Sequence, residues 1–184
     1  MSPIVLNLLT PAILLLYSIK KFMELNSSRT LLTIFIISII FPPFLSFIFQ
    51  AALIEFLLKS KGNEIIFIAF AAAIEETLKA AVLIVAIFKF KINNLILLLL
   101  SAAIVGANFS SIENFGIIFK DETMKDISLL ERLLISNLIH ILSQLIYVLI
   151  FYFSKFKNKI RIAIGLLLAI AIHISYNISA YFLE

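Results

Sequence analysis

The chain has 184 residues, of which 62% are hydrophobic and only 14% are charged, and its mean hydropathy is +1.13. A soluble domain is about one quarter charged, so this composition excludes a soluble protein and indicates one integral membrane domain over 1–184. The absence of cysteine excludes disulfides and thiol catalysis, and the net charge of +4 is spread over loops, which leaves no basic arm for nucleic acid.

Apolar runs separated by charged clusters predict an all-α, polytopic membrane bundle of about six to seven transmembrane helices. The first predicted span covers about 3–19 and is read as retained, because no basic stretch precedes it and no small-residue cleavage site follows. The second run, 30–58, is too long for one straight span and contains Pro42 and Pro43. We expect a kink at these prolines, or a span followed by an interfacial segment at 50–59.

Four further spans are predicted at 64–88, 92–119, 133–154 and about 160–183. Nine lysines and arginines follow the first, third and fifth spans: Lys20, Lys21, Arg29, Lys89, Lys91, Lys155, Lys157, Lys159 and Arg161. The opposite side has five: Lys59, Lys61, Lys120, Lys125 and Arg132. The positive-inside rule therefore predicts a multi-pass protein of the cell membrane with both termini extracytoplasmic.

The third span, 64–88, carries three charged residues near its middle, Glu75, Glu76 and Lys79. Each charge at the bilayer centre costs about 2.5–3.5 kcal/mol on insertion scales. Glu75 and Lys79 are one helical turn apart and are expected to pair, whereas Glu76 has no such partner in its own helix. Groups on other spans must therefore meet these side chains.

The fourth span places Gly106, Phe109 and Glu113 on one stripe, at steps of three and four, with Asn114 on the same turns. An intramembrane glutamate beside an asparagine is too costly to face lipid. For Gly106 alone, the favoured interpretation is close packing of two helices.

The fifth and sixth spans each carry one histidine, His140 in a seam of serines and His173 four residues before Asn177. Interhelical hydrogen bonding alone is the alternative interpretation for both histidines. At about 1.5 Å per residue, Glu75, Glu113, His140 and His173 lie about six to eleven residues from the outer ends of their spans. We therefore predict one intramembrane polar cavity in the outer half of the bilayer.

Such a cavity suits the hydrolysis of an amide by water. Two adjacent buried carboxylates cannot both stay charged without compensation, so one is protonated or balanced by Lys79, and a carboxylate remains to deprotonate water. Imidazoles can handle the proton, and an asparagine amide can donate to an oxyanion. The same glutamates and histidines also suit a divalent metal such as zinc, so no cofactor and a bound metal both stay open.

Four short motifs follow one another on successive spans: EExxK at Glu75–Lys79, GxxFxxxEN at Gly106–Asn114, an isolated His140, and HxxxN at His173–Asn177. Together they resemble the PrsW family of intramembrane proteases, which is related to the type II CAAX-processing endopeptidases. The resemblance covers about 64–184, and the spans over 1–63 carry no motif. The CAAX pattern fits less well, because it expects arginine at position 80 and histidine at position 113, where this chain has alanine and glutamate.

The resemblance implies a glutamate-dependent protease that makes the first cut in a membrane-anchored substrate, such as an anti-sigma factor with one span. It implies catalytic roles for Glu75, Glu76, Glu113, His140, His173 and Asn177, with either Glu75 or Glu76 as the general base. Lys79, Asn114, Phe109 and Gly106 would support them. The alternatives are a CAAX-type endopeptidase of prenylated proteins, a proton or metal-ion transporter that uses the same cluster, and an inactive scaffold or immunity-type protein. Oligomeric state is not predicted.

Overall fold

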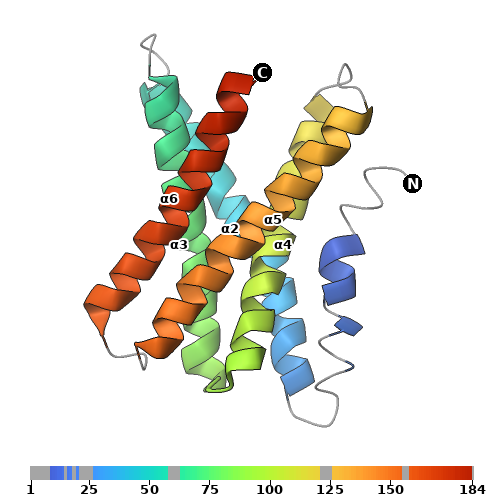
Figure 1. The fold of residues 1–184 in the computed structure, drawn as a ribbon, viewed down its shortest axis with the longest axis vertical. Coiled ribbons are helices and arrows are strands. Elements are labelled where there is room, and N and C mark those ends of the chain that lie inside the picture. Colours follow the sequence, from blue (N-terminus) through green and yellow to red (C-terminus); the bar gives the residue numbers. More distant parts are fainter. Residues whose placement is uncertain are drawn as a thin grey trace.

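Five long helices make up most of the described part of the chain, and no strand occurs in that part (Figure 1). The computed structural model describes residues 9–14, 16–17, 20, 27–57, 63–120, 126–154 and 158–183. The helices are α2 (Ser27–Leu57), α3 (Glu64–Phe90), α4 (Leu95–Lys120), α5 (Asp126–Phe153) and α6 (Lys159–Leu183). The all-α prediction is confirmed. Most of the predicted first span, 3–19, lies outside the described residues, although 9–14 and 16–17 are helical.

Among the described residues, four stretches are long and apolar enough to cross a membrane: Arg29–Phe56, Leu95–Gly116, Leu134–Phe153 and Lys159–Phe182. The helix α3, with 27 residues, is also long enough to cross a membrane. It is not among these four stretches, because Glu75, Glu76 and Lys79 make its centre more charged than theirs. All three of these charged side chains are buried against other helices. The prediction of a polytopic membrane protein is therefore confirmed.

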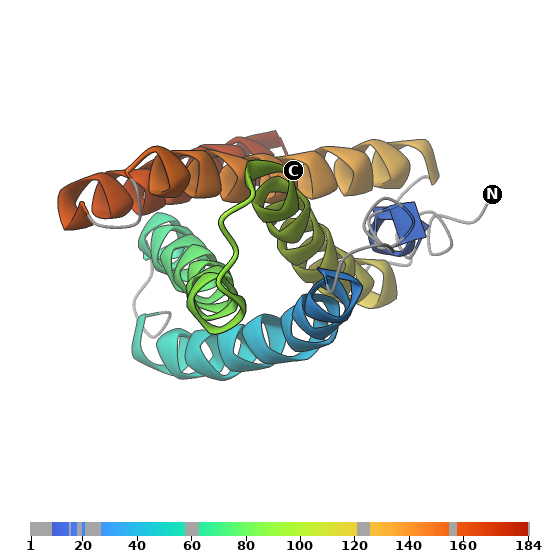
Figure 2. The same cartoon turned by 90° about the horizontal axis from the view of Figure 1, so that it is seen from below.

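The helices form three layers, with α2 on one side, α5 and α6 on the other, and α3 and α4 between them (Figure 2). Burial follows this arrangement: 72% of the apolar stretch of α4 is buried, compared with 28% in α2 and 17% in α6. The two middle helices are shielded from lipid on two sides, and this is why α3 can carry charges that an isolated span would not tolerate.

Local sequence explains several helix ends. The side chain of Asn94 accepts a hydrogen bond from the backbone N–H of Leu97 at 3.1 Å, and that of Asn158 accepts one from Arg161 at 3.1 Å. Both are N-terminal caps, which satisfy backbone donors that the helix leaves free. At the end of α3, Lys91 adopts a left-handed conformation with φ of 51° and its N–H bonds to the carbonyl of Ile87.

The second apolar run forms one continuous helix, α2, with Pro42 and Pro43 in its interior. The predicted alternatives, a kinked span or a span followed by an interfacial segment at 50–59, therefore share one helix up to Leu57, and residues 58 and 59 lie outside the described residues. Because the two prolines lack an N–H, the carbonyls four residues earlier lose their helical partners, which permits the helix to bend. The axis of α2 is visibly curved in Figure 2.

The helix α5 begins at Asp126, seven residues before the predicted start at 133. The apolar pattern marks only the stretch that suits lipid, while the helix itself continues into the polar sequence before it. The C-terminal ends of α2, α4 and α6 lie at the same end of the bundle as the starts of α3 and α5 (Figure 1). This alternation is the one that the predicted topology requires.

Candidate functional site

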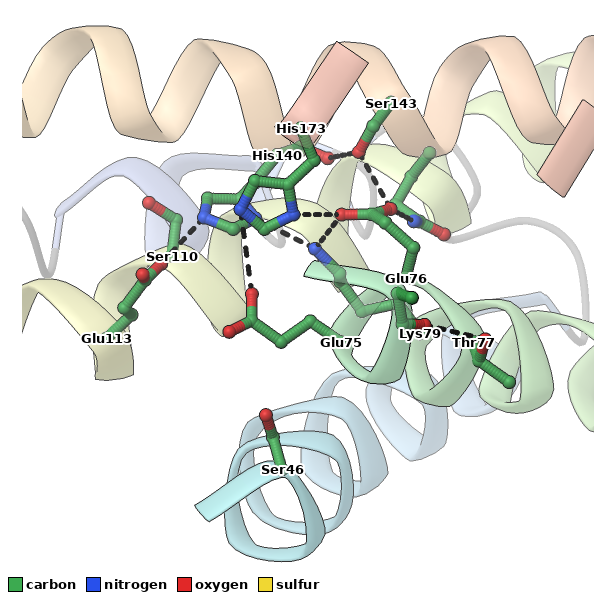
Figure 3. A network of polar contacts seen from close by, with 12 residues as sticks. Ser46, Glu75, Glu76, Thr77, Lys79, Ser110, Glu113, His140, Ser143 and His173 are labelled. Carbon is green, nitrogen blue, oxygen red and sulfur yellow. Dashed lines mark hydrogen bonds and ion pairs between the residues drawn. The ribbon is translucent and has the colours of Figure 1, made fainter. Parts of the chain in front are cut away.

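The charged residues and histidines singled out from the sequence lie together, as Figure 3 shows: Glu75, Glu76 and Lys79 on α3, Glu113 on α4, His140 on α5 and His173 on α6. The other residues singled out lie on the same helices: Gly106, Phe109 and Asn114 on α4, and Asn177 on α6. Hydrogen bonds or ion pairs join the three glutamates, the lysine and both histidines into one network. Helices that are far apart in sequence therefore supply one polar site.

Glu76 is the most fully bonded member of this network, and its side chain is completely buried. One carboxylate oxygen, Oε1, accepts from Lys79 Nζ and from His173 Nδ1, the latter at 2.8 Å. The other, Oε2, accepts from Ser143 Oγ at 3.0 Å and Gln144 Nε2 at 2.5 Å. Four donors from three helices hold this carboxylate in a single orientation. Such saturation is what makes a buried charge tolerable.

The expected pair between Glu75 and Lys79 is wrong, because Lys79 bonds to Glu76. Both pairs are possible on one helix, since residues three and four apart share a face. Donors from α5 and α6 keep Glu76 on the lysine's side, while Glu75 turns toward α2. There Glu75 Oε1 accepts a hydrogen bond of 2.6 Å from Gln50 Nε2.

Lys79, His140 and Glu113 form a chain of contacts from α3 across α5 to α4. Lys79 Nζ lies 2.8 Å from His140 Nδ1, and His140 Nε2 lies 2.7 Å from Glu113 Oε2. An ammonium group has only N–H bonds to offer, so Nδ1 accepts and the Nε2–H of His140 donates to Glu113. Glu113 therefore fixes the orientation of the His140 ring from α4.

Glu75 Oε2 and His173 Nε2 are buried atoms of the site that have no hydrogen-bond partner among the described residues. They face one another at 3.6 Å. Because His173 Nδ1–H donates to Glu76, its Nε2 is an acceptor in the neutral ring, as is the carboxylate oxygen. Two acceptors face each other stably only with a proton, a water or a cation between them.

Glu75, His140 and His173 also satisfy the geometry of a metal site. Each offers one ligand atom, all three residues are buried, and these atoms lie within 4.8 Å of one another. One carboxylate and two imidazoles form a donor set that zinc hydrolases use. The unpartnered atoms of Glu75 and His173 suit such an ion, whereas His140 would have to exchange one of its present contacts. The residues therefore fit a divalent metal.

Glu75 lies where two cavities meet. The larger cavity, of about 490 Å³, lies between α2 and α4, and the smaller, of about 260 Å³, is lined by α3 and α6 with contributions from α2, α4 and α5. Gln50, Glu75 and Glu113 line both of them. Asn177 is half-buried and lines the smaller cavity. The polar site is thus accessible from two directions through these three residues.

The remaining α4 residues pack around the histidine of α5. A Cβ atom on Gly106 would lie 2.5 Å from the backbone oxygen of His140, so only glycine permits this approach of α4 to α5. The ring of Phe109 lies 5.4 Å from that of His140, and Lys79 Nζ lies 4.4 Å from the Phe109 ring centre. Asn114 is buried and donates to Ser110 Oγ at 3.2 Å, one turn away from the network.

Three residues of the network were not assigned a role from the sequence: Gln50, Ser143 and Gln144. Gln50 is half-buried and bonds to Ser46 Oγ at 2.8 Å as well as to Glu75. A single glutamine within a long apolar run was the available signal. No motif in this run predicts which side of the helix contacts the polar site. Ser143 and Gln144 follow His140 in a polar stretch of α5. Their contact with Glu76 depends on the rotation of α5 about its axis, which the sequence does not specify.

A family model described as PrsW family intramembrane metalloprotease matches residues 26–184. A search of curated proteins and a search of solved structures gave no significant match. The match includes every one of the five long helices and therefore extends the resemblance to α2, which carries Gln50. On this evidence of motifs, geometry and family model, the chain belongs to the PrsW family of intramembrane metalloproteases.

Proposed function

We propose that this membrane peptide hydrolase cleaves a membrane-anchored protein substrate with a water molecule that Glu75 deprotonates. One observation carries the assignment of the base: Glu75 Oε2 is buried, has no hydrogen-bond partner in the described residues, and belongs to a side chain that lines both cavities. A general base must have a free lone pair within reach of the water. Glu76 has both oxygens occupied by donors, so its proposed role is to orient Lys79 and His173.

The proposed reaction is hydrolysis. The water oxygen attacks the carbonyl carbon while one water proton passes to Glu75 Oε2, and the C–N bond then breaks as the leaving nitrogen takes up a proton from the site. His173 lies 3.6 Å from Glu75 and is suited to hand that proton on. Asn177 lines the smaller cavity beside Glu75 and is the candidate donor to the oxyanion. Glu113 holds His140 in place.

The family description and the donor set both support a divalent metal in this site. Glu75, His140 and His173 would hold it, and it would supply Lewis-acid polarisation of the water and the scissile carbonyl. In that state Glu113 is the remaining carboxylate that lines both cavities and can accept a proton.

The proposed substrate class is a single-span membrane protein of the anti-sigma-factor kind, cut near the outer side of the membrane. The loop charges support this orientation, with the C-terminal end of α6 and the α2–α3 connection extracytoplasmic. Six lysines of that count lie outside the described residues: Lys21, Lys59, Lys61, Lys125, Lys155 and Lys157.

The experiment is co-reconstitution of the protein with candidate single-span substrates, followed by mass spectrometry of the products. We expect a defined product from the native protein and none from Glu75→Gln. The matched control is Glu64→Gln, the same change at an exposed position at the start of the same helix, which should cleave like the native protein.

Two outcomes would contradict the proposal. Unchanged cleavage by Glu75→Gln would remove Glu75 from the mechanism. Ion flux into vesicles that depends on Glu75, with no peptide product from any substrate, would make the cluster a transport pathway instead.

A further inference from the structure

The larger cavity is bigger than a hydrolytic water requires. Its volume of about 490 Å³ falls in the range of about 300–1,000 Å³ that is usual for ligand pockets, and the smaller cavity, at about 260 Å³, falls below it. The larger cavity lies directly against Glu75 and Glu113 and extends away from them between α2 and α4. Its position is therefore that of a binding pocket beside the reacting groups.

The walls of this cavity are mostly apolar. From the proline pair onward, α2 contributes Pro43, Phe47 and Gln50, which recur at steps of four and three and so form one helical face. From α4 come Ile112 and Gly116, together with the ring of Phe109. Polar groups lie at the end next to Glu75. A chemical group that fills this space should be apolar, and it should be attached to something polar at the carboxylates.

We propose that this cavity is a specificity subsite that receives a bulky apolar side chain, of the leucine, methionine or phenylalanine class, next to the scissile bond of the substrate. The inference rests on the proposed proteolytic function. A peptide with such a side chain in the cavity places its amide groups at Gln50, Glu75 and Glu113, where hydrogen bonds are available. A lipid tail would place methylene groups against these buried polar atoms and leave them unsatisfied.

The smaller cavity supports this path for the substrate. It begins at the same three residues and runs toward α6, where Asn177 lies in its wall. An extended peptide across the junction therefore has one cavity on each side of the bond that faces Glu75. The cavity between α2 and α4 is the one with room for a large side chain.

Gly116 offers a way to fill the subsite without rebuilding the fold. A Cβ atom on Gly116 would meet no atom of the described residues within 4 Å, and the residue lines the larger cavity. A phenylalanine there can occupy space that is now empty. Gly116→Ala is the matched control, because it makes the same backbone change and adds only a methyl group.

The test uses a library of synthetic single-span peptides in phosphatidylcholine–phosphatidylglycerol vesicles, with alanine, leucine or phenylalanine at each position around the cut, and mass spectrometry of the products. We expect the native protein to prefer leucine or phenylalanine over alanine at one position flanking the cut. In Gly116→Phe this preference should fall at least about tenfold, as for a filled hydrophobic pocket, while Gly116→Ala keeps it. An equal preference in the native protein and Gly116→Phe would overturn the subsite.

A second pair of variants tests the opposite wall. Phe47 lines the cavity and Phe44, on the same helix, does not; both are exposed, at 74% and 62%. Phe47→Ala should widen the range of accepted side chains, and Phe44→Ala should leave it unchanged. Cleavage that is lost in Glu75→Gln but shows no side-chain preference in any variant would overturn the subsite alone. Absence of Glu75-dependent cleavage in the native protein would overturn both the subsite and the proposed function.

Discussion

Two neighbouring carboxylates in this protein have opposite surroundings. Glu76 is completely buried and accepts hydrogen bonds from four donors, whereas Glu75 has one bonded oxygen and one buried oxygen without a partner in the described residues. A helix places consecutive residues about 100° apart, so one faces α5 and α6 and the other faces α2 and the cavities. The comparison separates a carboxylate that holds the site together from one that is free to react.

The largest expected effect tests whether Glu75 is the reactive carboxylate. Replacing the Glu75 carboxylate by an amide removes the proposed base and nearly preserves its volume. We expect Glu75→Gln to lower the rate of substrate cleavage by about 10²–10⁴, the usual contribution of general acid–base catalysis. The thermal unfolding midpoint in detergent should stay close to that of the native protein, because among the described residues Glu75 accepts a side-chain hydrogen bond from Gln50 alone.

If Glu76 holds the site together, replacing it should lower the stability of the protein. Glu76→Ala leaves the buried Lys79 ammonium without its counter-charge and removes the acceptor of Ser143 and Gln144. Breaking a buried ion pair costs about 3–5 kcal/mol, so we expect a large drop in the unfolding midpoint. Glu75→Ala is the comparison, and an equal drop in both variants would contradict the division of roles.

Removal of divalent metal distinguishes two roles for Glu75, general base and metal ligand. Glu75, His140 and His173 fit a metal, so a chelator that reduces cleavage about a hundredfold or more, with zinc restoring it, would make Glu75 a metal ligand and Glu113 the proton acceptor. The His173→Ala variant should contain less zinc, as measured by elemental analysis, and added zinc should not restore its cleavage activity. Full cleavage by metal-free protein, still lost in Glu75→Gln, would show that the carboxylate works without a metal.

Gly106 tests whether the position of α5 matters to the site. A side chain there collides with the backbone of His140, so Gly106→Val should push α4 and α5 apart and cost about 1–3 kcal/mol of stability. It should also lower cleavage, because His140 moves relative to Lys79 and Glu113. The control is Gly116→Ala, which has open space around it.

The smallest expected effect concerns Gln50, which orients Glu75 from α2. Gln50→Leu should lower kcat about tenfold with little change in the unfolding midpoint, since one hydrogen bond to a charged group is worth about 1.5–3 kcal/mol at most. Gln50→Asn, which is shorter by one methylene, should recover little of this rate if the 2.6 Å contact is what matters. A changed KM with unchanged kcat would assign Gln50 to substrate binding instead.

The sequence-based predictions are strongest where composition and local spacing decide the outcome. Charges at the centre of an apolar run must be buried by other helices, and this identified α3 and the partners His140 and His173 without knowledge of the fold. The start of α5 and the continuity of α2 were missed or left open, because polar sequence can extend a helix beyond lipid and a proline pair can bend a helix as well as end it.

By itself, the sequence determined which helices form, which polar residues have to be buried, and the family, because each of these follows from hydropathy, helical period or motif. Only the tertiary structure decided that Lys79 pairs with Glu76, that Gln50 reaches Glu75, and that Glu75 is the carboxylate lining both cavities. The physical reason is that spacing within one helix allows partners at three and four residues alike. The choice between them is made by donors on α2, α5 and α6, whose rotation and depth no local pattern records.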